Sequence, residues 1–421
     1  MATWTKKKLK DITTKIGSGA TPRGGQGAYH QEGMPLIRSL NVYDLAFSCD
    51  DLAFIDKSQA EQLANVTVEK NDVLLNITGA SVCRCTSVPD NLVPARVNQH
   101  VSIIRADKKN LIGKYLKYIL VSPLYKRALY GLATTGATRE ALTKNNIENF
   151  EIKLPNIDVQ IRIASVLSAY DDLIENNEKR IKVLEEMARR LYAEWFVKLN
   201  FPGYEKVKTI NSGTRYGMIP EGWEVKKLGD VSSIVRGCSY SSEEIDDFIG
   251  DFYIVNLKSF NRGGGFRFDG AKYYSGSIND NQSLKPGDVV VAVTDMTNDR
   301  AVIARPARVP EIDCKITFSA DVVKINSDIL PRSFIYQLLS SYRFTETTKQ
   351  KANGANVLHL KPTAILEFVA LIPDEQILNK FDVLCEPVVR EIDKTLKQND
   401  ILSKTRDLLI PQLVTGKREL K

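Results

Sequence analysis

Short apolar runs separated by turn residues occupy most of residues 1–150, and the same pattern returns over residues 223–373. The clearest runs are DVLLNIT at residues 72–78 and DVVVAVT at residues 288–294. Runs of four to eight β-branched or apolar residues between turn formers are typical of strands. A short helix is predicted later in each section, as KYLKYILVS and SFIYQLLSS. Both sections are therefore predicted to be globular domains of mixed α/β structure.

The pattern changes over residues 160–199, which contain no Gly and no Pro and are rich in good helix formers. Apolar residues recur there every seven positions, at Leu167, Ile174, Ile181, Ala188 and Trp195. A heptad seam sustained for about four repeats predicts a coiled-coil helix, and forty residues would span roughly 60 Å. A poorer seam follows residue 384. Pro387 and Pro411 are expected to break that second helix near its ends.

The chain is predicted to be a tandem repeat of one unit of about 217 residues, because matching residues recur at a nearly constant offset. The matched pairs include Trp4 with Trp223, Leu9 with Leu228, Gly136 with Gly354, Phe150 with Phe368, and Arg189 with Arg406. The predicted order is a globular domain at residues 1–155, a helix at 156–199, a linker at 200–222, a second domain at 223–373 and a second helix at 374–421. The fold class is α+β, with two mixed α/β domains in tandem.

The two helices are expected to pair with each other as an antiparallel coiled coil, since neither can bury its seam alone. Pairing with a second chain is the alternative. Asn177 and Asn399 lie on the two seams. Buried polar residues on a seam can fix its register, but a locally solvated stripe is an equally open interpretation.

Composition limits the classes of function. The 421 residues carry 58 basic and 51 acidic side chains, a net charge of +7 that permits a polyanionic partner. The six cysteines and three histidines are scattered, so no zinc site is expected. No apolar run approaches the length of a membrane helix, and the N-terminal MATWTKKKLKD lacks a secretory pattern. A cytoplasmic protein without a membrane partner is the expectation.

Catalytic motifs are sparse. The sequence has no phosphate-binding P-loop, no GxGxxG after a strand, no HExxH and no motif of a DNA amino-methyltransferase. Asp288, Asp313 and Lys315 have the spacing of the acidic and basic residues of a metal-dependent nuclease. Asp288 is also explained by a turn before a strand. The first repeat keeps the matching Asp72 but has no Asp-x-Lys that corresponds to Asp313 and Lys315. No catalytic site, metal or cofactor is therefore expected.

Polar loops supply candidates for DNA contact. A glycine-containing loop precedes each long helix, and the two copies diverge there, with Thr138 and Arg139 against Asn356 and Val357. Asn353 and Asn356 are the candidates of the second copy, and a turn that closes the domain is the alternative. Arginine and asparagine can read base edges through two hydrogen bonds. Weaker candidates lie in other loops and at strand ends, where solvated loops are the alternative: Ser18, Thr21, Arg23, Arg96, Asn98, Gln99, Arg236, Asn298, Arg300 and Lys315. His100 and His359 are expected to be packed or surface residues.

Three segments carry a resemblance to a known family. IPEGWEVKKLGDV at residues 219–231, TGATREAL at 135–142 and DLLIPQLVTGK at 407–417 resemble the specificity subunit of type I restriction–modification enzymes. The resemblance implies two target-recognition domains that each read one half of a bipartite site in double-stranded DNA. It also implies helices that set the spacer and dock two DNA adenine methyltransferase subunits, with restriction and translocase subunits joining a larger complex.

By the same resemblance, the chain has no catalytic site, S-adenosylmethionine belongs to the methyltransferase subunits, and ATP belongs to the nuclease subunits. The missing motifs agree with that. Two other functions stay open at this point. One is a stand-alone DNA nuclease or methyltransferase with fused recognition domains, and the other is a purely structural coiled-coil adaptor.

Overall fold

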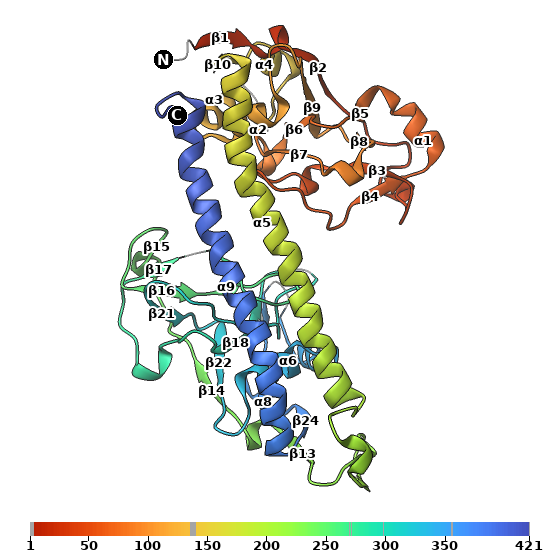
Figure 1. Ribbon diagram of the computed structural model, residues 1–421, viewed down its shortest axis with the longest axis vertical. Coiled ribbons are helices and arrows are strands. Elements are labelled where there is room, and N and C mark those ends of the chain that lie inside the picture. The colour runs from red at the N-terminus through yellow and green to blue at the C-terminus, as the bar shows by residue number, and fades with distance from the viewer. Residues whose placement is uncertain are drawn as a thin grey trace. The chain divides into compact units, whose positions relative to one another are not determined.

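The computed structural model describes residues 4–134, 140–268, 270, 272–297, 299–354 and 357–420. The described residues form two compact units, shown in Figure 1. Unit 1 comprises Met1–Ile174 and Leu402–Lys421, and unit 2 comprises Glu175–Ile401. Helix α5 (Ile157–Tyr192) and helix α9 (Glu375–Val414) each cross from one unit to the other. Each unit is therefore built from one globular section together with parts of both long helices.

In the described part of unit 1, two four-stranded sheets have the orders β2-β9-β6-β7 and β4-β3-β8-β5. The predicted strand at residues 72–78 is β6, and the predicted helix at 114–122 is α2. Strand β1 (Thr5–Lys8) pairs antiparallel with β10 (Glu151–Leu154). The other elements are β2 (Thr13–Ser18), β3 (Met34–Ile37), β4 (Ala53–Ile55), α1 (Lys57–Gln62), β5 (Thr67–Val68), β6 (Val73–Asn76), β7 (Cys85–Ser87), β8 (Ala95–Val97), β9 (Val101–Ala106), α2 (Gly113–Val121), α3 (Pro123–Thr134) and α4 (Lys144–Glu148).

Unit 2 repeats the order of the first sheet and two of the pairings of the second, but its fourth strand β15 lies beside β17, whereas β5 of unit 1 lies beside β8. Among its described residues, four-stranded sheets have the orders β14-β22-β18-β20 and β15-β17-β16-β21. Its elements are β11 (Thr209–Asn211), β12 (Met218–Pro220), β13 (Glu224–Lys227), β14 (Ser233–Arg236), β15 (Ile245–Asp246), β16 (Phe252–Val255), β17 (Tyr273–Tyr274), β18 (Val289–Ala292), β19 (Thr294–Asp295), β20 (Pro306–Arg308), β21 (Lys315–Phe318), β22 (Val322–Asn326), α6 (Arg332–Ser340), α7 (Tyr342–Lys349), β23 (Leu358–His359), α8 (Thr363–Leu366) and β24 (Val369–Ile372). The predicted strand 288–294 is β18, and the predicted helix 333–341 is α6.

The strand pairing shows that the repeat seen in the sequence is also present in the structure. Strand β2 ends with Ser18 opposite Ser102 of β9, and β14 ends with Arg236 opposite Val323 of β22. Strands β3 and β8 are parallel in unit 1, as are β16 and β21 in unit 2. The pair β1–β10 of unit 1 also has its counterpart in β13–β24 of unit 2.

The cores join the sheets to both long helices. In unit 1, the buried side chains of β6, β9 and α2 pack with Leu167 of α5 and with Leu413 and Val414 of α9. In unit 2, α5 ends in a π-helical turn, η7 (Ala193–Val197), whose Phe196 ring lies 4.9 Å from the rings of Phe334 and Phe381. Burial of these aromatic and aliphatic side chains is the main force that holds the helices to the domains.

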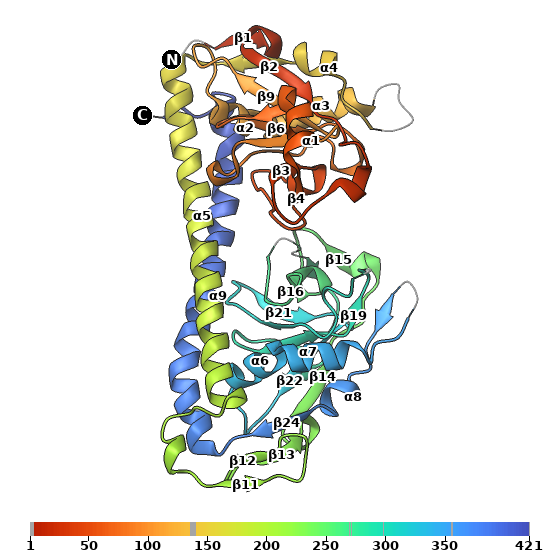
Figure 2. The same cartoon turned by 90° about the vertical axis from the view of Figure 1, so that its right-hand side faces the viewer.

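Helices α5 and α9 pair antiparallel within the chain, as predicted, and lie side by side in Figures 1 and 2. In unit 2, Asn177 Nδ2 donates to Asn399 Oδ1 at 2.8 Å, so the two seam asparagines meet across the helix pair. Arg180 forms an ion pair with Glu391 at 2.8 Å nearby. In unit 1, Arg406 pairs with Asp171 at 2.9 Å. The predicted α+β architecture with paired helices is confirmed.

The prediction that prolines break the second helix is wrong. Pro387 and Pro411 both lie inside the continuous α9. Proline removes one backbone hydrogen bond and crowds the preceding turn. Val389 is buried in the core of unit 2 and Ile410 in the core of unit 1. The burial of these neighbouring side chains offsets that loss.

The stretch between the repeats, expected to be a linker, contains ordered structure. Strands β11 and β12 form a hairpin in it, and Ile219 of β12 is buried. Phe201 is also buried, and its ring lies 4.9 Å from that of Trp223. The indole nitrogen of Trp223 donates to Asp374 Oδ2 at 3.2 Å. The hairpin is therefore anchored to the core of unit 2.

Candidate nucleic-acid interface

Four side chains in unit 1 form a chain of hydrogen bonds, and we call them the polar edge: Thr21, Gln99, His100 and Thr78. The Thr21 hydroxyl donates to Gln99 Oε1. Gln99 Nε2 lies 3.0 Å from His100 Nε2, and His100 Nδ1 lies 2.6 Å from Thr78 Oγ1. Thr21 and Gln99 are exposed, whereas His100 is half-buried. The polar edge therefore offers hydrogen-bonding groups to a ligand while its members hold one another in place.

Close backbone packing brings these loops together. The loop after β2 begins at Gly19, whose amide donates to the Asn98 carbonyl at 3.1 Å. A Cβ atom at residue 19 would lie only 1.7 Å from the Val97 carbonyl oxygen, so glycine is required there. Asn98 is buried, and its Oδ1 accepts from the His100 amide at 3.0 Å. Asn98 thus shapes the turn that presents Gln99.

The segment that follows the glycine-containing loop of the first repeat lies beside the polar edge. The Gly79 amide donates to the Glu140 carbonyl at 3.0 Å, and Thr78 forms a β-bridge with Ala141. The predicted contact residues Thr138 and Arg139 lie outside the described residues. Their chain neighbour Glu140 is nevertheless fixed next to the strand end that carries Thr78.

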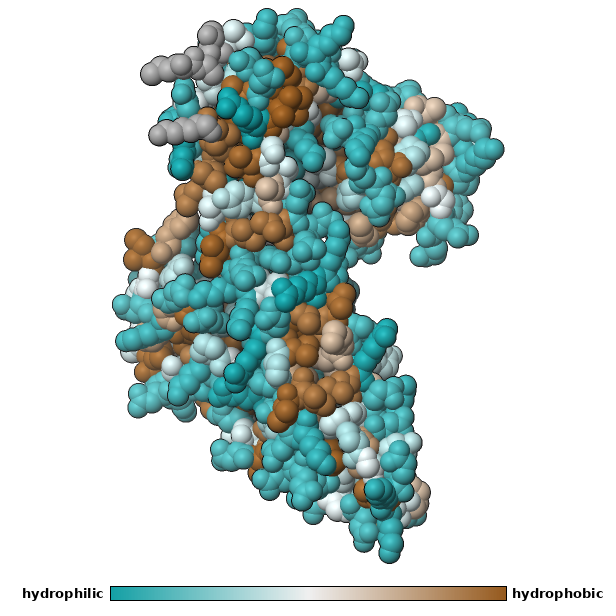
Figure 3. Space-filling view, viewed as in Figure 1, coloured by the Kyte–Doolittle hydropathy of each residue, from teal (hydrophilic) through white to brown (hydrophobic). Residues whose placement is uncertain are grey.

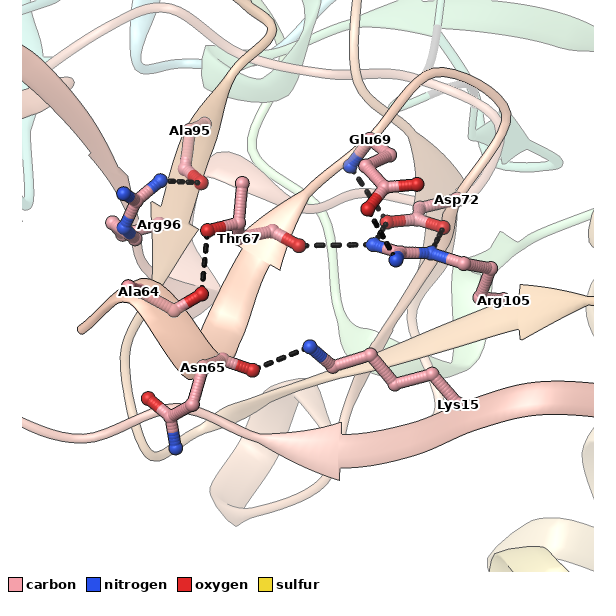
Figure 4. A network of polar contacts seen from close by, with 9 residues as sticks. All are labelled: Lys15, Ala64, Asn65, Thr67, Glu69, Asp72, Ala95, Arg96 and Arg105. Atoms are coloured by element: carbon pink, nitrogen blue, oxygen red, sulfur yellow. Dashed lines mark hydrogen bonds and ion pairs between the residues drawn. The ribbon is translucent and has the colours of Figure 1, made fainter.

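The remaining candidates of unit 1 have different surroundings. Ser18 and Arg23 are exposed, one at the end of β2 and the other in the loop after it. Arg96 is buried, and its Nε donates to the Ala60 carbonyl at 3.0 Å. Its Nη1 donates to the Ala95 carbonyl at 3.2 Å (Figure 4). Burial lowers the pKa of this guanidinium. The geometry gives Arg96 a structural role, and its contact with DNA stays a prediction.

Unit 2 places its own loop at the corresponding strand end. The Asn353 and His359 backbones exchange two hydrogen bonds, of 3.0 and 2.8 Å, and β23 pairs with β19 at Thr294. Thr294 Oγ1 lies 3.5 Å from His359 Nδ1. Gly354 has a φ of +139°, and a Cβ there would lie 1.9 Å from the Val357 carbonyl oxygen. Asn353 is exposed at the base of this loop, and Asn356 lies outside the described residues.

The buried carboxylate of Asp295 organises the second polar loop of unit 2. Its oxygens accept from the Thr297 amide at 2.7 Å and from the Val302 and Ile303 amides at 2.7 and 2.9 Å. Burial alone would raise the pKa of this carboxyl, but the hydrogen bonds hold it below its ordinary value of 3.8. The loop carries Arg300, which is half-buried with a φ of +55°, and Asn298, which lies outside the described residues.

Arg236 and Lys315 lie on different sheets of unit 2. Arg236 is exposed at the end of β14, and its carbonyl accepts from Gln282 Nε2 at 3.2 Å. Lys315 is exposed at the start of β21, with its ammonium 5.9 Å from the centre of the Phe252 ring. Both remain available on the surface as predicted contacts.

Sequence reasoning missed Thr78 and the part played by His100. Thr78 and Thr294 follow the matched strands β6 and β18 at the offset of the repeat, which was the available signal. His100 gave no such signal, because the residue that bonds the equivalent threonine in unit 2, His359, belongs to a different loop. The two repeats thus build similar contacts from different segments.

The residues with nuclease-like spacing have other partners. Asp288 pairs with Arg332 at 2.9 Å, and Asp313 pairs with Lys397 at 2.7 Å. In the first repeat, Arg105 Nε and Nη2 donate to the two oxygens of Asp72, both at 2.8 Å (Figure 4). Within the described ranges, no cluster of three histidine, cysteine or carboxylate side chains could hold a metal ion. In the same part of the chain, no helix is both long enough and apolar enough to span a membrane.

Comparison with known proteins shows which family this chain is similar to. Residues 1–186 match the model of the type I restriction modification DNA specificity domain. The type I restriction enzyme MjaIX specificity subunit of Methanocaldococcus jannaschii is 27% identical, over 98% of this chain and 93% of that protein. The chain is therefore similar to type I restriction enzyme specificity subunits over nearly its whole length. This confirms the expected resemblance.

Other similar proteins are more distant. The HindI specificity subunit of Haemophilus influenzae is 20% identical, over 84% of this chain and 88% of that protein. The crystal structure of the type I restriction–modification S subunit from M. genitalium superposes with a TM-score of 0.59 at 15% identity, covering 98% of this chain and 96% of that one. At this identity, the structural likeness concerns the fold of the specificity subunit.

Proposed function

We propose that this specificity subunit recognises a bipartite site in double-stranded DNA, with unit 1 reading one half and unit 2 the other. One observation carries the proposal. In both units, backbone pairing joins the threonine after the central strand, Thr78 or Thr294, to the end of the glycine-containing segment, at Ala141 or His359, and different side chains surround the two contacts. A repeated frame with different contact groups is suited to reading two different sequences in the same manner.

The chemistry of the exposed groups suits base recognition. Gln99 and Asn353 are exposed amides, which can pair with adenine in the major groove, and Arg23 and Arg236 are exposed guanidiniums, which can pair with guanine or phosphate. The net charge of +7 favours association with a polyanion. Specificity then comes from the loops, and sequence-independent affinity comes from the basic surface.

We assign the spacing of the two half-sites to the helix pair. Helices α5 and α9 contain 36 and 40 residues, which correspond to roughly 54 and 60 Å of helix. Both helices also leave large apolar side chains in solvent, among them Val183, Met187, Val383 and Leu408, each more than half exposed. Figure 3 shows apolar surface on this face of the molecule. Apolar surface of this kind marks sites where a partner protein docks.

The partners that we propose follow from the family. Two DNA adenine methyltransferase subunits would dock on the helices, and restriction and translocase subunits would join the larger complex. S-adenosylmethionine and ATP would bind to those subunits. This chain would supply the sequence preference and contribute no reacting group.

The test is to produce the chain together with its methyltransferase subunits and to sequence the methylated positions in a host genome. The proposal predicts a bipartite motif with an unspecified gap between two defined halves. For non-target DNA, the logarithm of the binding constant of the complex should fall linearly with the logarithm of the salt concentration, with a slope of about −0.9 per phosphate contacted. A continuous motif, or an affinity independent of salt, would contradict the proposal.

A further inference from the structure

Gln99 is an exposed amide whose two ends are both held by other side chains of the polar edge. Its Oε1 accepts from the Thr21 hydroxyl, and its Nε2 lies 3.0 Å from His100 Nε2. His100 is held in turn at Nδ1 by Thr78, at 2.6 Å, and its backbone amide is held by Asn98 Oδ1 at 3.0 Å. The amide plane of an exposed glutamine would otherwise turn freely about three side-chain bonds.

The direction of each hydrogen bond in the polar edge determines which donor and acceptor positions of Gln99 remain for a ligand. The Thr21 hydroxyl donates to Gln99, and the Gln99 amide donates to His100 Nε2, which is therefore the unprotonated nitrogen. The proton of the neutral imidazole then lies on Nδ1 and is donated to Thr78 Oγ1. An amide oxygen has two acceptor positions and an amide nitrogen has two protons. Gln99 thus keeps one acceptor and one donor, side by side, for a ligand.

We infer that Gln99 reads an adenine in the half-site of unit 1, and that Thr21 and His100 are positioning residues that hold its amide for this contact. An acceptor next to a donor matches N6–H and N7 of adenine in the major groove. Because the amide is already oriented, less side-chain freedom is lost on binding. The inference rests on the proposed function, which it deepens by naming a reader and its base.

The described residues of unit 2 do not repeat this arrangement at the corresponding position. The backbone amide of Asn98 donates to the carbonyl of Ile37, the last residue of β3. The backbone amide of Ser319 donates in the same way to Val255, the last residue of β16, so Ser319 corresponds to Asn98. The residue after Ser319 is Ala320, which cannot make the contact that Gln99 offers. Variants at Gln99 should therefore change only one half of the recognised motif.

The experiment uses the chain in complex with its methyltransferase subunits, with Gln99→Ala and Gln99→Glu as variants. Methylated motifs are sequenced, and affinities are measured for duplexes that vary each position of both halves. At one adenine position, Gln99→Ala should reduce discrimination by roughly 5- to 150-fold, the value of one bidentate contact. Gln99→Glu keeps the size but has no donor for N7, so it should lose the adenine preference as well. Gln31→Ala, at another exposed glutamine of unit 1, should change nothing.

The positioning role is tested by matched pairs. Thr21→Val removes the hydroxyl at nearly constant size and should weaken discrimination at the same adenine, whereas Thr21→Ser keeps the donor and should restore it. His100→Ala should act like Thr21→Val. His100→Gln, which retains an acceptor near the position of Nε2, should restore discrimination. A merely structural role would make these variants lose affinity for all sequences alike.

The outcomes separate this inference from the proposed function. If the wild-type complex methylates no bipartite motif, the proposed function fails. If the wild-type motif is bipartite and Gln99→Ala leaves both halves unchanged, or weakens binding to every sequence equally, only the reading by Gln99 is overturned. Loss of preference at a position other than adenine would overturn it too.

Discussion

Asp171 of α5 joins three elements of unit 1, and replacing it by asparagine tests how the helices are attached to the domain. Its Oδ2 accepts from Lys117 Nζ at 2.8 Å and from the Tyr118 hydroxyl at 2.6 Å, both on α2. Its Oδ1 accepts from Arg406 Nη1 of α9 at 2.9 Å. One carboxylate therefore links the globular section to both long helices.

The magnitude follows from the burial of these groups. The side chains of Asp171, Lys117 and Arg406 are 15%, 11% and 12% exposed, so little water can replace a lost partner. Removing one member of a buried ion pair costs about 3–5 kcal/mol. The asparagine amide keeps an acceptor, and Asp407 still pairs with Arg406 at 2.9 Å. We therefore expect Asp171→Asn to lower the unfolding free energy of unit 1 by about 2–4 kcal/mol.

Amide hydrogen exchange on the full chain is the assay, because it separates the two units. Exchange in the core strands β6 and β9 should accelerate by about 30- to 900-fold, the factor that corresponds to 2–4 kcal/mol. Strands β18 and β22 of unit 2 should change little. Asp172→Asn, at the exposed neighbouring position, makes the same chemical change and should have an effect below about 0.5 kcal/mol. Equal effects of the two variants, or acceleration in unit 2 alone, would refute the reasoning.

Acid provides a second readout of the same carboxylate. Burial alone would raise the pKa of Asp171, but Lys117, Tyr118 and Arg406 together hold it below the ordinary value of 3.8. The folded state thus binds a proton less readily than the unfolded state. The stabilisation is present above about pH 4 and should be lost as the pH falls through the lower, folded-state pKa. Asp171→Asn should weaken this acid dependence of unit 1, measured by exchange or circular dichroism.

The remaining predictions concern the helix pair. Leu413→Ala, which removes a fully packed side chain of α9 from the unit 1 core, should cost about 2–5 kcal/mol, and the exposed Leu408→Ala should cost little. Denaturant unfolding measures the unfolding free energy of each variant. Equal losses for Leu413→Ala and Leu408→Ala would contradict the assigned packing. Replacing Asn177 alone by leucine removes its 2.8 Å hydrogen bond to Asn399 and should cost about 1–3 kcal/mol, whereas replacing both should be nearly neutral or stabilising. A double variant that is less stable than the single one would disprove this reading.

Much of the architecture could be predicted from the sequence because it follows from apolar periodicity and from the repeat. The runs that became β6 and β18 are fully buried in their sheets, and the seam residues Leu167 and Ala188 are buried against the domains. The position of Asn177 and Asn399 on the two seams was also visible in the sequence, whereas their hydrogen bond to each other is seen only in the fold. These features depend on residues close in sequence or related by a constant offset.

Features that depend on distant contacts could not be predicted. Arg96 has the chemistry of a DNA-contacting residue, but its guanidinium bonds the carbonyl of Ala60, 36 positions away. Thr21 and Gln99 were separate candidates, and only the fold shows that they bond each other across 78 positions. Pro387 and Pro411 wrongly predicted breaks in α9. The helix continues through both because Val389 is buried in the core of unit 2 and Ile410 in the core of unit 1.

The central claim is that each unit reads its own half of one DNA site, and paired loop variants test it most directly. Arg139→Ala alters the loop of the first repeat and Asn353→Ala that of the second. The measurement is sequencing of the methylated motif in hosts that carry the wild-type complex or one of the two variants. The account predicts that each variant relaxes a different half and leaves the other half and the gap unchanged. If both variants alter the same half, or neither alters the motif, the assignment of one half-site to each unit is contradicted.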